Sequence, residues 1–386
     1  MNAVLHGIIY KIISIVLSIA SIFGVSRDCL KADSSSWNTN YKYVFVHGLQ
    51  GWGSYDKQYK VMPYWGMFGG ELMGYLNDKG FDCYAASVAP NGSAWDRACE
   101  LYAQLTGTVV DYGKEHSERC NHDRFGEDFT GRALIDSFSA EDKINILGHS
   151  FGGATVRLFA SIMEKGAEAE KAVTPEAELS DFFKGGKGDW IYSMVTLAAP
   201  HNGTTAYNIN KRAEDKEDGF LSNAMAKLNA ATDDRISSDY ANYDMYIDNA
   251  LELNKTILTY ENTYYFSYAC NATEQNEDGT YSPIKSKMEM LFRSSSEAMG
   301  KYTGTTKGGY VIDETWQMND GLVNTVSALA PSDAPQTPYE EGNVQKGIWN
   351  VMPIYDGDHM SLQGGMTKPN DVKDLYVDLF SMINSL

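Results

Sequence analysis

The chain has 386 residues, 43% of them hydrophobic, which is enough to bury the core of one large α/β domain. Its formal net charge of −19 excludes nucleic acid as a partner, because 32 basic side chains among 51 acidic ones cannot neutralise a run of phosphates. The charge also opposes docking on anionic membranes, but it is compatible with neutral lipid or ester substrates.

The first 32 residues (1–32) are predicted to be a signal peptide and lead-in. The segment Ile12–Val25 follows Lys11 and is almost wholly apolar. It is short for a membrane span and typical of a signal-peptide core, so we expect a secreted protein, with an uncleaved N-terminal anchor as the alternative. The five cysteines form no CxxC pair and predict free thiols or at most one disulfide.

Residues 33–386 are predicted to form a single domain. Strands alternate with helices throughout, and this order favours an α/β fold with a mostly parallel sheet. A strand at 41–46 is followed by a helix at 70–79 and a strand at 81–86. Between about 90 and 135 the alternation is interrupted by histidines, charges and glycines, and we interpret this segment as an insertion.

Three side chains of the insertion form a possible metal site. Asp96, His116 and His122 supply two imidazoles and a carboxylate, which Zn²⁺ accepts as ligands. Cys120 lies between the histidines and is a competing ligand. From spacing alone, exposed histidines in a polar loop explain the pattern as well as a metal site does.

The stretch 143–153 predicts a catalytic serine. An apolar run ends abruptly at Gly-His-Ser-Phe-Gly, and a helical pattern follows. Strand, tight turn and helix in this order favour a nucleophile elbow around Ser150 over an ordinary glycine-rich turn. The backbone N–H of Phe151 and that of Leu49, in the His-Gly loop after the first strand, are the expected oxyanion donors.

The remaining elements continue the alternation. A strand is predicted at 190–197, another at 264–269 and a closing helix at 372–383. The charged stretch 207–253 is interpreted as a helical lid over the carboxyl end of the sheet, although an ordinary surface helix fits its pattern equally well.

A serine nucleophile needs a base and an acid. His359 stands late in the chain, in a loop before the final helix, where a hydrolase of this order places its base. The acid must lie between Ser150 and His359, and Asp320 in an Asn-Asp-Gly turn fits best, with Asp313 as the competitor. Asp358 adjoins the histidine and is expected to shape its loop.

Long motifs resemble the zinc-containing lipases of Gram-positive bacteria, family I.5 of the bacterial lipases, with the staphylococcal lipases as nearer cousins. The resemblance extends from Tyr41 to the C-terminus with gaps. The matching stretches include Val44–Gly48, Gly51–Gly53, Trp95–Glu100, Tyr102–Leu105, Asp111–Gly113, Arg124–Gly126, Pro200–His201, Gly203–Thr205, Asn319–Gly321, Val323–Ser327 and Asp358–His359.

The resemblance implies an α/β-hydrolase fold with a zinc-binding insertion and a helical lid. It also implies a catalytic triad of Ser150, Asp320 and His359. Leu49 and Phe151 would be the oxyanion donors, Phe151 standing where the family has glutamine.

The resemblance further implies a tetrahedral zinc ion. Its ligands would be Asp96, His116, His122 and a later aspartate, which the local match makes Asp248, with Asp244 as the alternative. Four protein ligands leave no open position, so this zinc would be structural rather than a water-activating centre.

Two departures from the family bear on function. Ser361 and Met366 stand where the family has calcium-binding carboxylates, which argues against Ca²⁺. The stretch 207–253 is shorter and more charged than the family's apolar lid, which argues against strong interfacial activation and long-chain preference.

The sequence therefore predicts a secreted serine hydrolase of carboxylic esters, foremost a triacylglycerol lipase acting on glycerolipid at a lipid–water interface. A short-chain carboxylesterase or phospholipase is the alternative within this class. A catalytically idle lipid-binding module and a zinc hydrolase are the alternatives outside it. No obligate protein partner is indicated.

Overall fold

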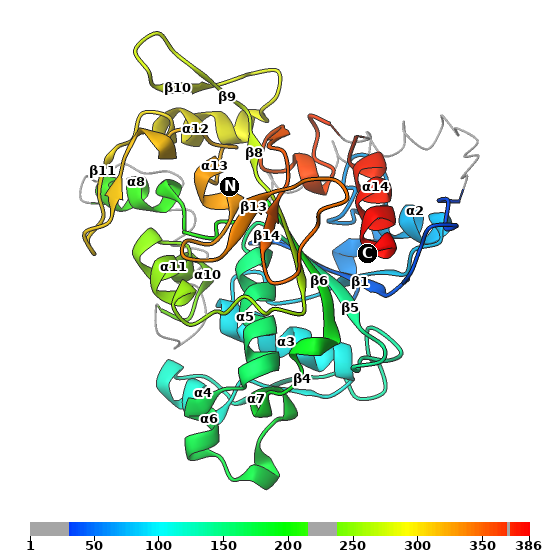
Figure 1. Cartoon of the computed structure of the whole chain (residues 1–386). Coiled ribbons are helices and arrows are strands. Elements are labelled where there is room, and N and C mark those ends of the chain that lie inside the picture. The colour runs from blue at the N-terminus through cyan, green and yellow to red at the C-terminus, as the bar shows by residue number, and fades with distance from the viewer. Residues whose placement is uncertain (1–30, 215–237, 369–370) are drawn as a thin grey trace.

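The computed structural model describes residues 31–214, 238–368 and 371–386 (Figure 1). Their centre is a seven-stranded sheet in the order β13-β14-β7-β6-β5-β1-β2, in which every neighbouring pair is parallel. The predicted α/β-hydrolase architecture with a parallel central sheet is confirmed. The strands of this sheet are β1 (Lys42–Val46), β2 (Cys83–Ala86), β5 (Ile144–His149), β6 (Ile191–Leu197), β7 (Tyr264–Tyr268), β13 (Gln336–Pro338) and β14 (Trp349–Val351).

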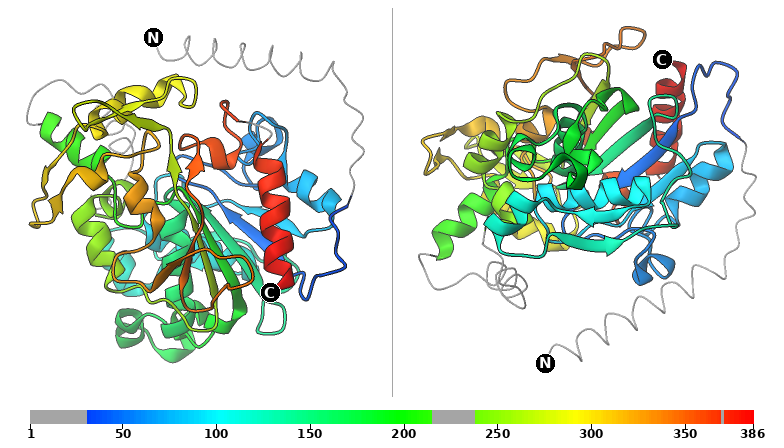
Figure 2. Two further views of the ribbon diagram at one scale, coloured as in Figure 1. Left: turned by 45° about the horizontal axis from the view of Figure 1, so that its top comes forward. Right: turned by 90° about the horizontal axis from the view of Figure 1, so that it is seen from below.

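Helices cover both faces of the sheet, and the alternation of side chains along β1 explains why. Val44 and Val46 enter the core beneath α3 and α5, whereas Tyr43 and Phe45 enter the core beneath α2 and α14. In the right-hand view of Figure 2, α3 (cyan) and α14 (red) lie on opposite sides of the strands. These four helices are α2 (Leu72–Lys79), α3 (Ala94–Thr106), α5 (Gly152–Lys165) and α14 (Asp371–Ser385).

Shorter elements surround this framework. Four two-stranded pairs are formed by β3 (Val109–Asp111) with β4 (Phe125–Asp128), β8 (Cys270–Asn271) with β15 (Tyr355–Asp356), β9 (Thr273–Gln275) with β10 (Tyr281–Pro283), and β11 (Gly304–Thr305) with β12 (Val311–Ile312). The remaining α-helices are α4 (Lys114–Cys120), α6 (Glu168–Val173), α7 (Asp181–Lys184), α8 (Thr205–Glu214), α10 (Ala241–Asp244), α11 (Ile247–Asn254), α12 (Arg293–Met299) and α13 (Thr325–Leu329).

The predicted insertion, 90–135, includes one helix of the main framework. Within it, α3 packs against α5 and buries most of its residues in the core. The part that departs from the alternating pattern is the β3–α4–β4 unit, which lies with α6 and α7 at the lower end of Figure 1.

Two predictions fall wholly or partly outside the described residues. The predicted signal core, Ile12–Val25, lies in the segment that is not described, and so does Cys29. The predicted lid is described only by α8, α10 and α11, with 215–237 left out. The four described cysteines are buried free thiols. No helix in the described ranges has the length and apolar character that crossing a membrane requires.

Candidate active site and metal cluster

Ser150 lies in the tight turn between β5 and α5. Its φ is +55°, in the left-handed region, and its N–H donates to the carbonyl of Leu197 on β6 (2.8 Å). A Cβ on Gly148 would lie 2.4 Å from the carbonyl oxygen of Gly152, and one on Gly152 would lie 2.4 Å from that of Val46. The close backbone passage therefore requires both glycines. The turn has the strained geometry of a nucleophile elbow at the carboxyl edge of the sheet.

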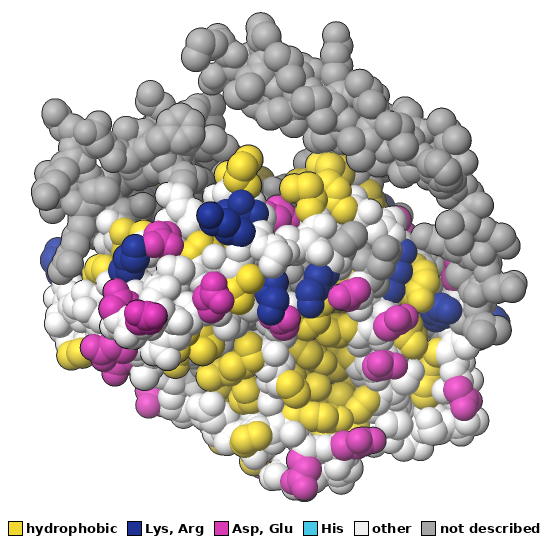
Figure 3. All heavy atoms as spheres, turned by 90° about the horizontal axis from the view of Figure 1, so that it is seen from above, with side chains coloured by type: hydrophobic (Ala, Val, Ile, Leu, Met, Phe, Trp, Pro, Cys, Tyr) yellow, Lys and Arg dark blue, Asp and Glu magenta, His cyan; other side chains and the backbone are white. Residues whose placement is uncertain are grey.

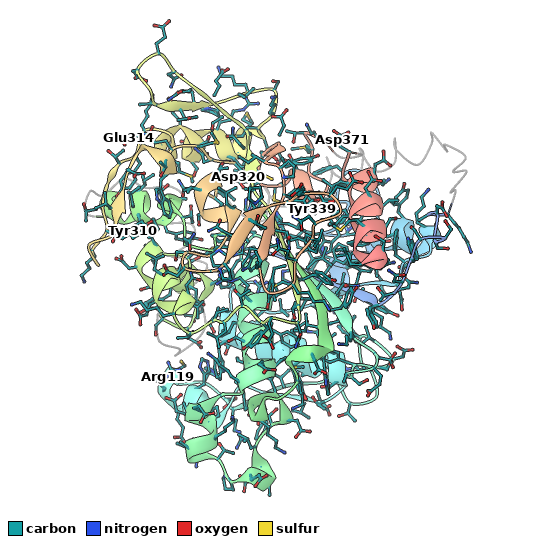
Figure 4. The ribbon with its side chains drawn as sticks, in the orientation of Figure 1. Arg119, Tyr310, Glu314, Asp320, Tyr339 and Asp371 are labelled. Carbon is teal, nitrogen blue, oxygen red and sulfur yellow. The ribbon has the colours of Figure 1, made fainter. Side chains whose placement is uncertain are left out.

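Three predicted residues converge at this edge. Ser150 Oγ lies 2.8 Å from Nε2 of His359, and Nδ1 of His359 lies 2.9 Å from Oδ2 of Asp320. All three residues are buried, Ser150 being 8% exposed. A carboxylate only accepts, so Nδ1–H donates to Asp320 and Nε2 accepts from the serine hydroxyl. In Figure 4, Asp320 lies in the upper central part of the molecule.

The second oxygen of Asp320 is held by backbone. Its Oδ1 accepts from the N–H groups of Leu322 (3.0 Å) and Val323 (2.7 Å), so Oδ2 is left to face the histidine. The backbone N–H of His359 also donates to the carbonyl of Asp320 (2.9 Å). The Asn-Asp-Gly turn and the histidine loop are therefore joined at two points.

The competing acids have other partners. Asp313 accepts from the N–H of Thr315 (3.0 Å) and caps the short helical turn that follows it. Asp358 accepts from the N–H of Glu289 (2.8 Å) and from the hydroxyl of Ser361 (2.9 Å). These contacts give Asp358 the loop-shaping place expected from the sequence.

The two backbone N–H groups expected to form the oxyanion hole flank the serine. Phe151 follows it directly, and a Cβ on Gly48 would lie 2.7 Å from the Cβ of Ser150, so the Gly48–Leu49 loop runs against the nucleophile. Neither the Leu49 N–H nor the Phe151 N–H has an acceptor among the residues described. Both donors are therefore open to a ligand at the serine.

Arg97, on α3, holds this loop from behind. Its guanidinium donates to the carbonyl of His47 and, at 3.4 Å, to that of Gly48, and it lies 5.1 Å from the ring centroid of Phe151. Burial lowers its pKa to about 10, which leaves it charged at neutral pH. The Gly48 carbonyl also accepts from Nδ1–H of His47 (2.8 Å) and from the N–H of Gly51 (3.2 Å), so Arg97 is one of three donors that fix the peptide carrying the Leu49 N–H.

A buried histidine ties the elbow to the base. His149 Nε2 lies 2.8 Å from the carbonyl oxygen of His359 and must donate to it, so its Nδ1 accepts from the hydroxyl of Tyr64 (2.6 Å). The Tyr64 oxygen in turn accepts from the N–H of Gly48 (3.1 Å). Burial lowers the pKa of His149 to about 3 and keeps it neutral. One neutral network therefore connects the oxyanion loop, the elbow and the catalytic loop.

A second cluster lies between α3, α4 and the residue before Tyr240. The cluster consists of Asp96, His116, His122 and Asp239, whose ligand atoms all lie within 4.8 Å of one another. His116 Nε2 is 3.0 Å from Asp96 Oδ1 and 3.2 Å from Asp239 Oδ1. His122 Nε2 is 3.4 Å from Asp239 Oδ2 and 3.8 Å from Asp96 Oδ1.

The residues of this cluster fit a metal ion. His122 Nε2 is buried and has no hydrogen-bond partner among the described residues, although two carboxylates face it. Trp95 stacks on the ring of His116 with centroids 5.2 Å apart, and Tyr112 packs edge-on against His122 at 5.2 Å. The imidazoles are therefore held with their Nε2 atoms toward the two carboxylates, as a bound cation requires. Arg119, labelled in Figure 4, marks this lower end of the molecule.

The choice of Asp248 as the fourth member of this cluster is wrong. Asp248 accepts from the hydroxyl of Thr306 and from the N–H of Gly308 (2.8 Å), away from the histidines. The alternative, Asp244, accepts from the N–H of Ala94 at the start of α3 (2.8 Å), and burial raises its pKa to about 7. Asp239 takes the fourth place.

Pairing between distant segments brings Asp239 to the cluster. Tyr240 forms a bridge with Gly92, just before α3, and this bridge sets the preceding aspartate beside Asp96. The available signal was the Asp-Tyr pair at 239–240, but Tyr-Asp at 243–244 and Tyr-Ile-Asp at 246–248 repeat it within nine residues. Local similarity therefore could not separate the three aspartates.

Two residues, Ser361 and Met366, stand where the family is expected to have calcium-binding carboxylates. The Ser361 hydroxyl donates to Asp358 and also lies 3.2 Å from the Thr367 hydroxyl, while the Met366 side chain is 58% exposed. The expectation that Ca²⁺ is not bound here stays a prediction.

The chain is similar in sequence to a known protein family and to curated proteins. The model of the family described as "Lipase-like, C-terminal domain" matches residues 39–220 and 222–381. Among curated proteins, the lipase of Staphylococcus hyicus is 29% identical over 376 residues, covering 89% of this chain and 56% of that protein. The chain spans about half the length of the curated relatives it matches.

Two solved structures have the same fold. EstA from Clostridium botulinum superposes with a TM-score of 0.78 at 31% identity, covering 94% of this chain and 90% of that one. The Staphylococcus hyicus lipase superposes with a TM-score of 0.75 at 26% identity, covering 90% of this chain and 97% of that one.

Proposed function

Because the chain belongs to the "Lipase-like, C-terminal domain" family, we propose that it is a secreted serine hydrolase that cleaves carboxylic esters, foremost triacylglycerols. The observation that carries this proposal is the unbroken hydrogen-bond chain from Ser150 Oγ through His359 to Asp320, at a strained elbow beside two open backbone donors. This arrangement matches the requirements of acyl transfer through a covalent intermediate.

In the first half-reaction, Ser150 Oγ attacks the acyl carbonyl carbon and its proton passes to Nε2 of His359. The Asp320 carboxylate accepts the Nδ1–H bond and stabilises the imidazolium that forms. The N–H groups of Leu49 and Phe151 donate to the oxyanion of the tetrahedral intermediate. Nε2–H then protonates the leaving alcohol, and the acyl group stays on the serine.

In the second half-reaction, water takes the place of the alcohol. His359 Nε2 removes a proton as the water oxygen attacks the acyl carbonyl, and the same two N–H groups stabilise the oxyanion. Collapse of this intermediate returns the proton to Ser150 Oγ and releases the carboxylic acid. The transfers between Ser150 Oγ and His359 Nε2 join two atoms that already lie 2.8 Å apart.

Exposed apolar side chains near the catalytic base, His359, support a lipid–water interface as the place where the protein meets its substrate. Met290 is 80% exposed, Leu291 70% and Met366 58%. Glu289 connects them to the active site, because its carboxylate accepts from the N–H of Met366 (2.9 Å) and its N–H donates to Asp358. Hydrophobic side chains gather in patches on the face shown in Figure 3. Such patches are typical of surfaces that meet lipid.

The acyl-chain profile tests this proposal. We expect the protein to hydrolyse p-nitrophenyl esters, and a rate maximum at about eight carbons or longer supports a triacylglycerol lipase. A maximum at two to four carbons would instead identify a short-chain esterase. Cleavage confined to phospholipid would identify a phospholipase. No hydrolysis above that of a Ser150→Ala blank, combined with vesicle binding, would favour an idle lipid-binding module.

The position of Arg97 predicts a split between turnover and binding. Arg97→Met removes the donor to the His47 carbonyl and one of the three donors to the Gly48 carbonyl, so the Leu49 N–H is held less firmly, and kcat is expected to fall about 10-fold with little change in KM. Arg97→Lys keeps the charge and should recover part of kcat. Steady-state kinetics check this, with metal content measured in parallel because Asp96 directly precedes Arg97. An unchanged kcat in Arg97→Met would contradict the assignment.

The cluster of Asp96, His116, His122 and Asp239 is proposed to hold Zn²⁺ in a structural role. Two imidazoles and two carboxylates are a donor set that suits tetrahedral zinc. Four protein ligands leave no position for a reacting water, so the ion would cross-link α3, α4 and the segment before α10.

Ligand replacement tests the metal assignment. Asp239→Ala is expected to lower zinc affinity by more than about 100-fold, because the ion loses one of its four ligands. The melting temperature should fall as well, because without the zinc ion the remaining buried ligands lose its positive charge. Asp248→Ala, the matched control, should keep one zinc per chain. Elemental analysis and thermal unfolding with and without chelator check both. Zinc loss in the control alone would contradict the assignment, and loss of turnover on chelation at temperatures where the fold survives would favour a zinc hydrolase.

A further inference from the structure

A cavity of about 330 Å³ lies on the α5 face of the sheet, and no triad residue lines it. Its floor is made by Met194, Tyr265 and Trp349, which are neighbours across β6, β7 and β14. Arg157 and Ala160 of α5 form one wall. The other walls come from residues 254–259, after α11, and from the loop 331–335.

Arg157 brings a buried positive charge to this cavity. Arg157 is only 4% exposed, and no carboxylate of the described residues lies within 4.0 Å of its guanidinium. Its one recorded hydrogen bond runs from Nη2 to the Oδ1 of Asn254 (2.7 Å), a neutral acceptor. Burial lowers its pKa to about 9, so it is charged at neutral pH. By contrast, Arg124 is fully paired by Asp111 through two bonds of 2.9 Å.

Hydrogen bonds among the neighbouring residues hold the walls of the cavity in a defined position. The Asn254 amide donates to the carbonyl of His201 (3.0 Å) and to Asn202 Oδ1 (2.9 Å), which sets its own oxygen toward Arg157. Asn202 Oδ1 also accepts from the N–H of Ser332 (2.7 Å) and thereby anchors the 331–335 loop. A guanidinium carries five N–H donors, and one neutral oxygen leaves most of them for a ligand.

The remaining lining combines apolar surface with polar groups, which include Lys255 and Thr259. Met194, Ile257, Leu258 and Trp349 contribute hydrocarbon surface, and Leu258 is 55% exposed at the rim. Asp333 also lines the cavity, but it is exposed and its charge is screened by water, whereas Arg157 is buried. At about 30 Å³ per water-sized group, the cavity holds roughly ten non-hydrogen atoms, the size of octanoate.

We propose that this cavity is a binding site for an amphiphilic carboxylate, a medium-chain fatty acid, whose head pairs with Arg157 and whose chain lies against the apolar wall. A buried charge without a counter-charge is costly, and a bidentate carboxylate removes that cost. The site is separate from the acyl-transfer centre, so the inference stands whether or not the proposed hydrolase activity is confirmed.

Calorimetry with octanoate tests the proposal on full-length protein in the Ser150→Ala background, which has no turnover. Octanoate is expected to bind at least about tenfold more tightly than octan-1-ol, which has the chain without the charge, and than acetate, which has the charge without the chain. Arg157→Met should weaken octanoate binding by about tenfold or more, with Arg157→Lys intermediate. Ala160→Leu, which fills the cavity and keeps the arginine, should weaken it as well.

The same set of variants separates this cavity from an acyl groove at the serine. Equal octanoate binding in the parent, Arg157→Met and Ala160→Leu would place the ligand elsewhere and overturn the proposal, as would no binding at all, which would leave a water-filled cavity. A crystal soaked with 8-bromooctanoate gives an independent readout. An anomalous bromine signal between α5 and the 254–259 segment is expected, and a signal only at Ser150 would contradict the assignment.

Discussion

Ester hydrolysis is expected to fall by about 10⁶-fold when Ser150 is replaced by alanine, with the fold unchanged. The hydroxyl of Ser150 forms one hydrogen bond, to His359 Nε2, so its loss removes the nucleophile and this single bond, while His359 stays bound to Asp320 through Nδ1. Measurement of kcat with a p-nitrophenyl ester, beside circular dichroism and thermal unfolding, checks both parts of this prediction.

Ser161→Ala is the matched control for that substitution. Ser161 lies on the same helix, α5, is fully buried and donates a long hydrogen bond to the carbonyl of Thr256 (3.4 Å). This variant is expected to lose at most about 1 kcal/mol of stability and to keep its activity. Equal loss of activity in both variants would indicate a general disturbance of α5. Full activity in Ser150→Ala would contradict the assignment of Ser150 as the nucleophile.

The second large effect is expected at Asp320. In Asp320→Asn, the N–H groups of Leu322 and Val323 will hold the amide oxygen where Oδ1 now lies, because only an oxygen can accept them. The amide NH₂ then faces His359 Nδ1 and forces the proton onto Nε2, where it blocks transfer from the serine. We expect kcat to fall by about 10⁴-fold with little change in KM.

Asp313→Asn controls for the loss of a carboxylate in the same region. Asp313 caps a turn by accepting from the N–H of Thr315, and asparagine caps such turns equally well, so activity and stability should be close to those of the parent. A large loss of kcat in Asp313→Asn with a small one in Asp320→Asn would reverse the assignment of the acid. Nitrogen-15 NMR of the His359 ring would report the change of tautomer directly.

The parts of the site that the sequence could predict are those encoded locally or by chain order. Ser150 lies in a five-residue motif that can be recognised from local sequence, although the close approach that requires Gly152 comes from the Val46 carbonyl on β1. His359 and Asp320 follow from the order of nucleophile, acid and base in this fold. Their distances could not be predicted, because they depend on two loops 39 residues apart meeting beside the elbow.

The parts that could not be predicted depend on pairing between distant segments. Asp239 is brought to the cluster by the bridge between Gly92 and Tyr240, and no local sequence pattern predicts this bridge. Arg97 lies within the matching stretch Trp95–Glu100, but the motif does not reveal its contact with the oxyanion loop. A charged residue on the buried face of α3, among Ala98, Leu101 and Leu105, was the available signal. The predicted signal peptide and much of the predicted lid lie outside the described residues and stay predictions.

Covalent labelling is the measurement that tests the central claim most directly. The mature protein would be treated with a p-nitrophenyl alkylphosphonate, which resembles the tetrahedral intermediate of ester hydrolysis, and the adduct would be located by peptide mass spectrometry. We predict one equivalent of p-nitrophenol, complete loss of activity and a single adduct on Ser150. An adduct on another residue, or full hydrolytic activity without any adduct on Ser150, would contradict the account.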